Sequence, residues 1–183
     1  SLDLDEVLET IVKSVKQVVS CDAVGIFLVD RKTQEVEQIK IEGYDPTLEI
    51  DLNLKVGEGL IGWVAKTGET VIVPDVRKDN RYINARLQTL SELVAPIIKD
   101  RKVLGVFNLE SDHLNAYSEE DLELLTAFAS QAAVSIERAR LHKETLRRKY
   151  LEDELKIART IQTTFLPERN PILSGFDISG INI

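Results

Sequence analysis

The chain has 183 residues, 43% of them hydrophobic, so it is long enough to bury one medium-sized core and to carry an appended segment. With 31 acidic and 23 basic residues its net charge is −8, which argues against general binding of nucleic acids or anionic membranes. The single cysteine, Cys21, excludes an intrachain disulfide and fits a reducing compartment, so we expect a cytoplasmic protein with neither a nucleic-acid nor a membrane partner.

The first half of the chain predicts a helix, two strands, a short helix and another strand. Apolar residues recur at helical spacing over residues 2–19. Two extended runs follow at 23–29 and 35–41, and the second alternates between apolar and polar residues. A short helix is predicted at 60–66, bracketed by glycines, and a strand at 70–74.

The second half predicts a β-hairpin and then one long helix. Strands at 92–98 and 103–109 flank a four-residue turn. Ser118 is placed to cap the helix, with Asp121 where a capping box usually has Glu. Neither Gly nor Pro occurs from 119 to 166, so a helix of about 48 residues is permitted. The order of elements indicates an antiparallel sheet with helices packed on it, an α+β domain.

The sharpest local motif lies in the glycine-rich stretch before the short helix. Gly57 and Gly59 allow the backbone to take positive φ and to approach another element closely. A phosphate-binding loop is disfavoured, because no Gly-Lys-Ser/Thr follows and the carboxylate of Glu58 would repel a phosphate. A structural turn is therefore the favoured interpretation.

This stretch also carries a family resemblance. The sequence Asn53-Leu-Lys-Val-Gly-Glu-Gly-Leu-Ile-Gly-Trp-Val-Ala-Lys-Thr-Gly-Glu-Thr-Val-Ile-Val-Pro-Asp-Val76 resembles the central signature of GAF domains. Residues 77–82, 91–97 and 105–109 continue the match. The resemblance implies a GAF sensor domain over residues 1–141, with a GAF-like antiparallel sheet between helices.

A GAF domain of this kind implies a pocket for an unidentified small molecule, or else a protein partner as its input. Each candidate residue also has a simpler structural role: Trp63 could pack in the core, Asp75 could cap a turn and Arg81 could be a solvated loop cation. The ligand-pocket candidates by resemblance are Trp63, Asp75, Arg81, Tyr82 and Asn108.

Cyclic-nucleotide GAF domains resemble one another in an Asn-Lys pair, then Phe, three residues and Asp-Glu. This chain has Ser111-Asp112, then Tyr117, then Asp121 followed by Leu122, so only part of that motif is present. A cyclic-nucleotide receptor coupled to another output domain stays open as an alternative.

A GAF-fold reductase of free methionine sulfoxide is the second alternative. Such enzymes need several cysteines to attack the substrate and resolve the intermediate, and Cys21 alone cannot complete that cycle. His113 and His142 lie far apart in the sequence without clustered partners, so no metal or haem site is expected.

Along the long helix, apolar and small residues recur at alternating spacings of four and three, the pattern of a coiled-coil seam. We expect a parallel homodimer; a helix folding back on the sheet is the alternative, which the polar residues 144–149 disfavour. The pattern slips by one residue at Tyr150 and Leu151, so the linker 142–166 is predicted to have two registers. The dimer and linker positions are Leu125, Ala129, Ala132, Ile136, Ala139, Leu146, Tyr150, Leu155, Ile157, Ala158, Ile161 and Phe165.

The end of the chain carries a second resemblance. Residues 154–167, Glu-Leu-Lys-Ile-Ala-Arg-Thr-Ile-Gln-Thr-Thr-Phe-Leu-Pro, with 175–183, Gly-Phe-Asp-Ile-Ser-Gly-Ile-Asn-Ile, resemble the entry to PPM-type serine/threonine phosphatases of the sporulation stage II E-like family. The resemblance implies that residues 167–183 begin a phosphatase domain whose metal-binding aspartates lie beyond this chain.

This chain is therefore expected to lack catalytic residues and to hold no cofactor itself. The resemblance assigns Mn or Mg, and a phosphoprotein substrate, to the phosphatase domain that is missing here. The expected function is that of a regulatory sensor and dimerising linker of a bacterial phosphatase, which passes a GAF input to the catalytic domain.

Overall fold

The computed structural model describes residues 4–30, 32–44, 54–165 and 174–175. The chain divides into two compact units, Ser1–Ala139 and Arg140–Ile183. The domain boundary expected from the sequence, between residues 141 and 142, lies two residues from this division.

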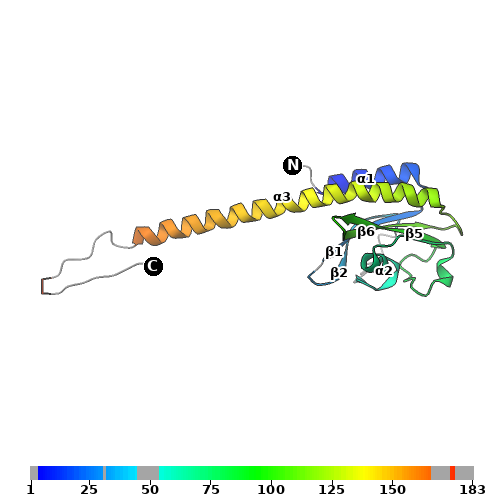
Figure 1. The fold of residues 1–183 in the computed structure, drawn as a ribbon, viewed down its shortest axis with the longest axis horizontal. Coiled ribbons are helices and arrows are strands. Elements are labelled where there is room, and N and C mark those ends of the chain that lie inside the picture. Colours follow the sequence, from blue (N-terminus) through cyan, green and yellow to red (C-terminus); the bar gives the residue numbers. More distant parts are fainter. Residues whose placement is uncertain (1–3, 31, 45–53, 166–173, 176–183) are drawn as a thin grey trace. The chain divides into compact units, whose positions relative to one another are not determined.

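A six-stranded antiparallel sheet forms the centre of the first unit, in the spatial order β3-β2-β1-β6-β5-β4 (Figure 1). Every strand predicted from the sequence is present, and β3 is added to them. Its two residues are too few to show an alternating pattern in the sequence. The strands are β1 (Ala23–Asp30), β2 (Glu35–Glu42), β3 (Leu54–Lys55), β4 (Val71–Val73), β5 (Ser91–Lys99) and β6 (Lys102–Ser111).

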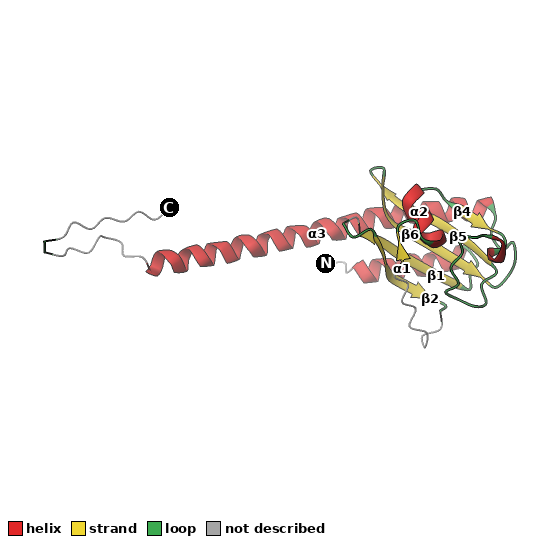
Figure 2. Cartoon of the chain, turned by 90° about the horizontal axis from the view of Figure 1, so that it is seen from below, coloured by secondary structure: helices red, strands yellow, loops and turns green. Residues whose placement is uncertain are grey.

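Helices cover both faces of this sheet, which confirms the expected α+β architecture. Helix α1 (Leu4–Val18) and the start of α3 (Glu119–Phe165) lie side by side on one face, while α2 (Gly59–Thr67) lies on the other (Figure 1; Figure 2). The periodic apolar residues of α1 are buried, as a stripe facing the sheet requires. They are Leu8, Ile11, Val12 and Val15.

The glycine motif before α2 serves close packing. Gly59 has a φ of +68°, which a glycine adopts without steric cost. At Gly62 a β-carbon would lie 2.3 Å from the carbonyl oxygen of Lys55, so only glycine lets α2 approach β3 this closely. Both observations agree with the structural turn inferred from the sequence.

A capping box starts α3, as predicted. The amide of Ser118 donates to Oδ2 of Asp121 at 2.8 Å, and the amide of Asp121 donates to Oγ of Ser118 at 3.3 Å. The pair satisfies two backbone donors that the first turn of a helix leaves without partners. From there the helix runs to Phe165 without interruption.

The first four residues of the expected dimer seam are buried within the chain itself. Leu125, Ala129, Ala132 and Ile136 are 0%, 1%, 0% and 5% exposed, and they belong to the core cluster formed with α1 and the sheet. This corrects the expectation that they face a second chain. The apolar stripe of a helix lying on its own sheet has nearly the same spacing as a coiled-coil seam, so the sequence pattern alone could not separate the two.

In the second unit the expected linker positions are exposed. Ala158 is among them. The side chain of Phe165 lies outside the described part of the chain, and so do residue 166 and the expected phosphatase start at 167–183, apart from residues 174 and 175. None of the described helices combines the length and apolarity that a bilayer crossing requires. The exposed large apolar side chains here are Leu141, Leu146, Tyr150, Leu151, Leu155, Ile157 and Ile161.

Replacing a buried leucine by alanine should lower the free energy of unfolding more than the same replacement of an exposed leucine. Leu125→Ala should lower the free energy of unfolding by about 2–5 kcal/mol, because it leaves a cavity in a closed core. Leu87→Ala, at a side chain that is 82% exposed in the loop before β5 and outside the long helix, should change it by no more than about 0.5 kcal/mol. Urea denaturation at one fixed protein concentration measures both. Equal losses would mean that Leu125 is not a core residue.

Candidate functional site

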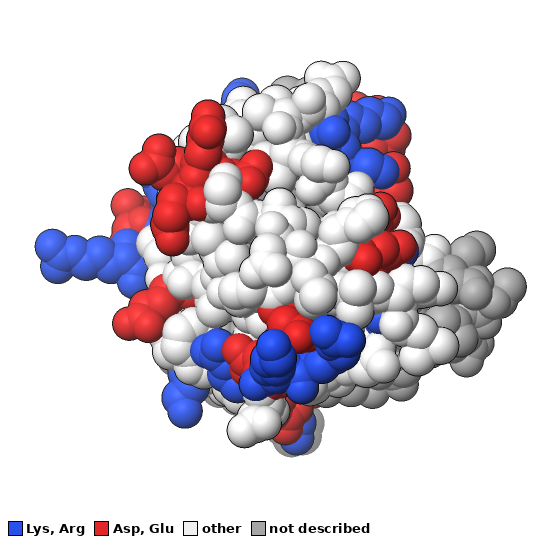
Figure 3. Space-filling view, turned by 90° about the vertical axis from the view of Figure 1, so that its right-hand side faces the viewer, with Lys and Arg blue, Asp and Glu red and all other residues white. Residues whose placement is uncertain are grey.

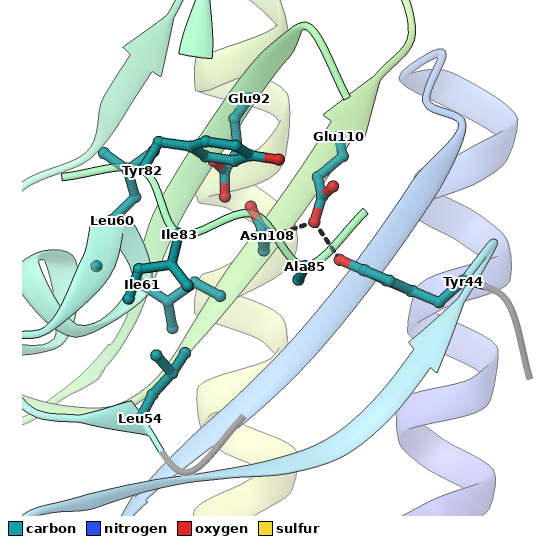
Figure 4. Close-up of a pocket in the computed structure, with 11 residues that line it drawn as sticks. Tyr44, Leu54, Leu60, Ile61, Tyr82, Ile83, Ala85, Glu92, Asn108 and Glu110 are labelled. Carbon is teal, nitrogen blue, oxygen red and sulfur yellow. Dashed lines mark hydrogen bonds between the residues drawn. The ribbon is translucent and has the colours of Figure 1, made fainter. Parts of the chain in front are cut away.

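A cavity lies on the α2 face of the sheet, beneath the loop that joins η1 (Val76–Lys78) to β5 (Figure 4). It is an open hollow: its empty space of about 340 Å³ includes space open to solvent, and its enclosed part, about 20 Å³, holds a group of roughly the size of one water molecule. One side of the lining is apolar and the other is polar. The lining residues are Tyr44, Leu54, Gly59, Leu60, Ile61, Tyr82, Ile83, Ala85, Glu92, Asn108 and Glu110.

The polar side of the cavity is built by two neighbouring strands. Glu92 on β5 pairs directly with Glu110 on β6, so the two carboxyl groups stand side by side on one face of the sheet. Asn108 precedes Glu110 by two residues and therefore shares that face. Like charges placed opposite each other across two strands destabilise a sheet. The fold thus tolerates an unfavourable pair at this cavity.

Three donors converge on Glu110. The hydroxyl of Tyr44 donates to Oε1 and the hydroxyl of Thr89 to Oε2, while Nδ2 of Asn108 donates to Oε1 at 3.0 Å. Burial raises the pKa of Tyr44, and that of Tyr82 to about 12, so both hydroxyl groups keep their protons at neutral pH. Both oxygen atoms of Glu110 thus accept hydrogen bonds from neighbouring side chains.

Glu92 has a contrasting environment. It is 3% exposed, and its Oε2 finds no hydrogen-bond partner among the described residues; the same holds for Oδ1 of Asn108, whose residue is 1% exposed. Burial, and next the charge of Glu110, raise the pKa of Glu92 well above its usual range, and a hydrogen bond from Asn108 offsets part of this. Two buried acceptors with unused capacity therefore face one cavity.

Arg86 ties down the loop that covers this cavity. Its Nε donates to the carbonyl oxygen of Gly43 at 3.2 Å, and its guanidinium forms a two-pronged ion pair with Asp112, including Nη2 to Oδ2 at 3.1 Å. The loop residues Tyr82 and Ala85 line the cavity just before it in the chain. Arg86 thus joins the cover to the ends of β2 and β6.

Of the five candidates chosen from the sequence, the structure places Tyr82 and Asn108 on the cavity. Trp63 is partly buried and packs against the core cluster on the α2 side. Arg81 stacks on it, with its guanidinium carbon 4.4 Å from the ring centroid, and pairs with Asp79 at 2.7 Å. Trp63 therefore has the packing role that the sequence allowed, whereas Arg81 is held by Trp63 and Asp79 and is not the solvated loop cation considered from the sequence.

Asp75 also has a structural role. Its Oδ1 accepts from the backbone amide of Arg77 at 3.2 Å and from Nε of the same residue at 2.8 Å, which caps η1. These bonds to Arg77 hold the pKa of Asp75 below its usual range. On the face drawn in Figure 3, charged side chains gather in groups around an uncharged middle, and the groups at its lower edge and upper right mix basic with acidic side chains.

Sequence reasoning missed the acidic half of the site. Glu92 and Glu110 stand in strands whose residues are almost all buried on both faces, so alternation did not reveal which way they point. A charged residue inside a fully apolar strand was the available signal, since Glu is almost never buried unless paired. Tyr44 and Thr89 lie in loops and gave no comparable signal.

Two observations on the described residues bear on metal and thiol chemistry. The described part of the chain contains no group of three or more His, Cys, Asp and Glu residues arranged to hold a metal ion. Cys21 is partly buried, and burial raises its pKa to about 11. A thiol with so high a pKa is a poor nucleophile at neutral pH.

Comparison with known proteins gives one family and several relatives. The family model for the GAF domain matches residues 3–136. GAF domain-containing protein A of Dictyostelium discoideum is 33% identical over 103 residues, which are 56% of this chain and 62% of that protein. The free methionine-R-sulfoxide reductase of Saccharomyces cerevisiae is 39% identical over 77 residues, 42% of this chain and 43% of the enzyme. The chain thus spans less than two thirds of the length of these relatives.

A solved structure agrees with this fold. The free methionine-R-sulfoxide reductase of Neisseria meningitidis in complex with its substrate superposes with a TM-score of 0.69 at 25% sequence identity. The superposition covers 78% of this chain and 83% of that one.

The raised pKa of Glu92 predicts that its contribution to the free energy of unfolding depends on pH. Because the folded protein holds this proton more tightly than the unfolded chain, stability is lost as the pH rises above the ordinary value of 4.5 toward the folded pKa. Glu92→Gln should therefore raise the free energy of unfolding by about 1–2 kcal/mol at about pH 8 and change it little at about pH 4. Urea denaturation across this pH range measures the difference.

The exposed Glu120→Gln on α3 is the matched control and should keep the pH dependence of the wild type. If Glu92→Gln also kept it, the buried carboxyl would not be the source of that pH dependence.

Proposed function

The chain belongs to the GAF domain family, and we propose that it is a regulatory sensor that binds a small molecule in the cavity and transmits its presence through α3. One observation carries the proposal: Glu92 and Asn108 each bury an acceptor that no described residue satisfies, and both line the cavity. An apolar pair of similar shape would stabilise a purely structural domain better than two opposed carboxyl groups. A ligand that supplies hydrogen bonds explains why such residues stand here.

The sheet provides a physical route from the cavity to α3. Leu93 and Leu109 pair across β5 and β6 next to the two glutamates, and they point to the opposite face. There they belong to the same buried cluster as Leu125 and Ala129 of α3. A ligand that moves β5 against β6 would thereby alter the packing of the helix, since close-packed interiors transmit small displacements.

We further propose that residues 140–165 of α3 pair with a second copy in a parallel homodimer. The support is the row of exposed large apolar side chains on a helix that is otherwise polar, for which a partner helix would provide burial. The one-residue slip at Tyr150 and Leu151 would allow two registers. A few kcal/mol of differential ligand binding would suffice to shift the balance between them.

The proposed output is a PPM-type serine/threonine phosphatase that uses Mn or Mg and acts on a phosphoprotein. Its support is the sequence resemblance of residues 154–167 and 175–183 alone, because the GAF match ends at residue 136. In this proposal the present chain supplies the sensor and the linker, and the catalysis belongs to the attached domain.

A reductase is the second candidate, favoured by the similarity to free methionine-R-sulfoxide reductases. The one cysteine of the chain, with its raised pKa, speaks against it. Free methionine-R-sulfoxide incubated with the whole chain and a thiol reductant should show no turnover above that of Cys21→Ser. Turnover that Cys21→Ser abolishes would establish the reductase instead.

A cyclic nucleotide is disfavoured as the ligand because its phosphate would meet the two carboxyl groups. Calorimetry of the whole chain with cyclic AMP and cyclic GMP should give no binding heat. Binding of either that is lost on Glu92→Gln would be inconsistent with this charge argument.

The dimer is tested by a substitution on the apolar row of α3. Leu155→Asn should raise the dimer dissociation constant at least about tenfold, equivalent to about 1.4 kcal/mol, because it removes a side chain buried by the partner helix. Asp153→Asn places the same residue on another side of the helix and should leave the constant unchanged. Light scattering over a concentration series measures both. A monomeric wild type, or equal effects of the two variants, would reject the proposed seam.

The sensor role is tested with a chemically varied metabolite library. At least one compound should raise the melting temperature of the whole chain, since a ligand at about a hundred times its Kd adds about 2.7 kcal/mol of stability. Ala85→Trp, which fills the cavity mouth, should abolish this shift, and Leu87→Trp, at an 82% exposed position of the same loop, should keep it. A shift that Ala85→Trp retains would place binding elsewhere.

A further inference from the structure

We propose that the ligand is a small molecule with a primary ammonium group on a short apolar body, and that Glu92, Asn108 and Glu110 hold the ammonium. This inference rests on the proposed sensor function and names the ligand class for the same cavity. Figure 4 shows the three side chains directed toward one space, with Tyr82 and Tyr44 beside it.

The hydrogen-bonding capacity of the cavity calls for donors. Glu92 offers Oε2 and Asn108 offers Oδ1, both without partners among the described residues. Glu110 already accepts three hydrogen bonds, and a carboxylate has roughly four lone-pair positions, so it can accept one more. The three remaining acceptors match an ammonium group, which has three donors and no acceptor.

The charge of the cavity selects a cation over an anion. Glu92 and Glu110 line it. Two charges outside the lining are each already paired: Asp79, which acts on Glu92, pairs with Arg81, and Arg86, which interacts with the charge of Glu110, pairs with Asp112. An anionic group would therefore meet two carboxyl groups without a free cation among the residues that line the site.

An organic cation fits better than a metal ion. Calcium takes six to eight oxygen ligands and magnesium about six in a strict octahedron, and the described residues form no acidic cluster of three or more. The other wall of the cavity is apolar and would contact the carbon atoms of the ligand. It consists of Leu54, Leu60, Ile61, Ile83 and Ala85.

Ammonium binding is linked to the proton of Glu92. Burial and the charges of Glu110 and Asp79 raise the pKa of Glu92, while a hydrogen bond from Asn108 lowers it. The other titratable groups that Glu92 influences are the hydroxyls of Tyr82, Tyr44 and Tyr117, whose raised pKa values keep them neutral. An ammonium in contact would favour ionised Glu92, so binding should release a proton and strengthen as the pH rises.

The test uses matched probes that differ in one group. Isothermal titration calorimetry of the whole chain with n-butylammonium, 1-butanol and butyrate at about pH 7 should show the cation binding at least about tenfold more tightly than the other two. Repeating the titration in buffers of different ionisation enthalpy should reveal proton release. Methyl-, ethyl- and propylammonium complete the series for the size of the cavity.

Glu92→Gln should weaken n-butylammonium binding at least about tenfold and abolish the proton release, whereas Glu120→Gln should change neither. This comparison stays informative because Glu92→Gln is expected to fold at least as stably as the wild type. Equal binding of butanol or butyrate, no binding of any ammonium in the series, or full binding by Glu92→Gln would each overturn the inference.

The failure of this inference is distinguishable from that of the sensor function. If an uncharged or anionic metabolite from the library stabilises the wild type but not Ala85→Trp, the sensor stands and the ammonium class is wrong. If no compound of any class binds in the cavity, both fail.

Discussion

Strands β5 and β6 pair from Ser91 with Ser111 to Lys99 with Lys102, and the two faces of this pair carry opposite kinds of side chain. On one face Leu93 and Leu109 join the closed apolar core beneath α1 and α3. On the other, Glu92 faces Glu110 in a cavity. Because side chains alternate along a strand, one register fixes both arrangements at once. A slip of one residue would bury the glutamates in the apolar core and expose the leucines to the cavity.

The polar face therefore contains unfavourable interactions, and packing in the rest of the domain offsets them. Two opposed carboxyl groups, and two acceptors without partners among the described residues, cost free energy, and the apolar cluster on the other face offsets that cost. Unfavourable local interactions are expected at functional sites, where a bound ligand can supply the missing hydrogen bonds. Since the same strands carry the core contacts of α3, relief of these unfavourable interactions by a ligand would act directly on the packing of that helix.

Helix α3 has two environments along its length. In the first unit its apolar stripe is completed by the sheet of the same chain, and in the second unit its apolar side chains are exposed. The spacing of residues is continuous across the boundary, so the change does not come from the sequence period. It separates residues such as Ala132, which is buried in the domain, from residues such as Leu155, which is 71% exposed in this chain.

The sequence by itself determined α1, α2, α3, five of the six strands and the Ser118–Asp121 capping box, which follow from local periodicity and local hydrogen bonding. It also determined the family, through the resemblance of residues 53–76 to the GAF signature. It also identified Tyr82 and Asn108 as candidate residues of the pocket, and both line the cavity. Only the tertiary structure decided that Trp63, Asp75 and Arg81 have structural roles. It also decided that Leu125, Ala129, Ala132 and Ile136 pack into the core of their own domain, and that Glu92 lies opposite Glu110. The physical reason is that these are contacts between segments distant in the chain, and a strand buried on both faces or a helix with one apolar stripe has the same local pattern whichever surface it meets.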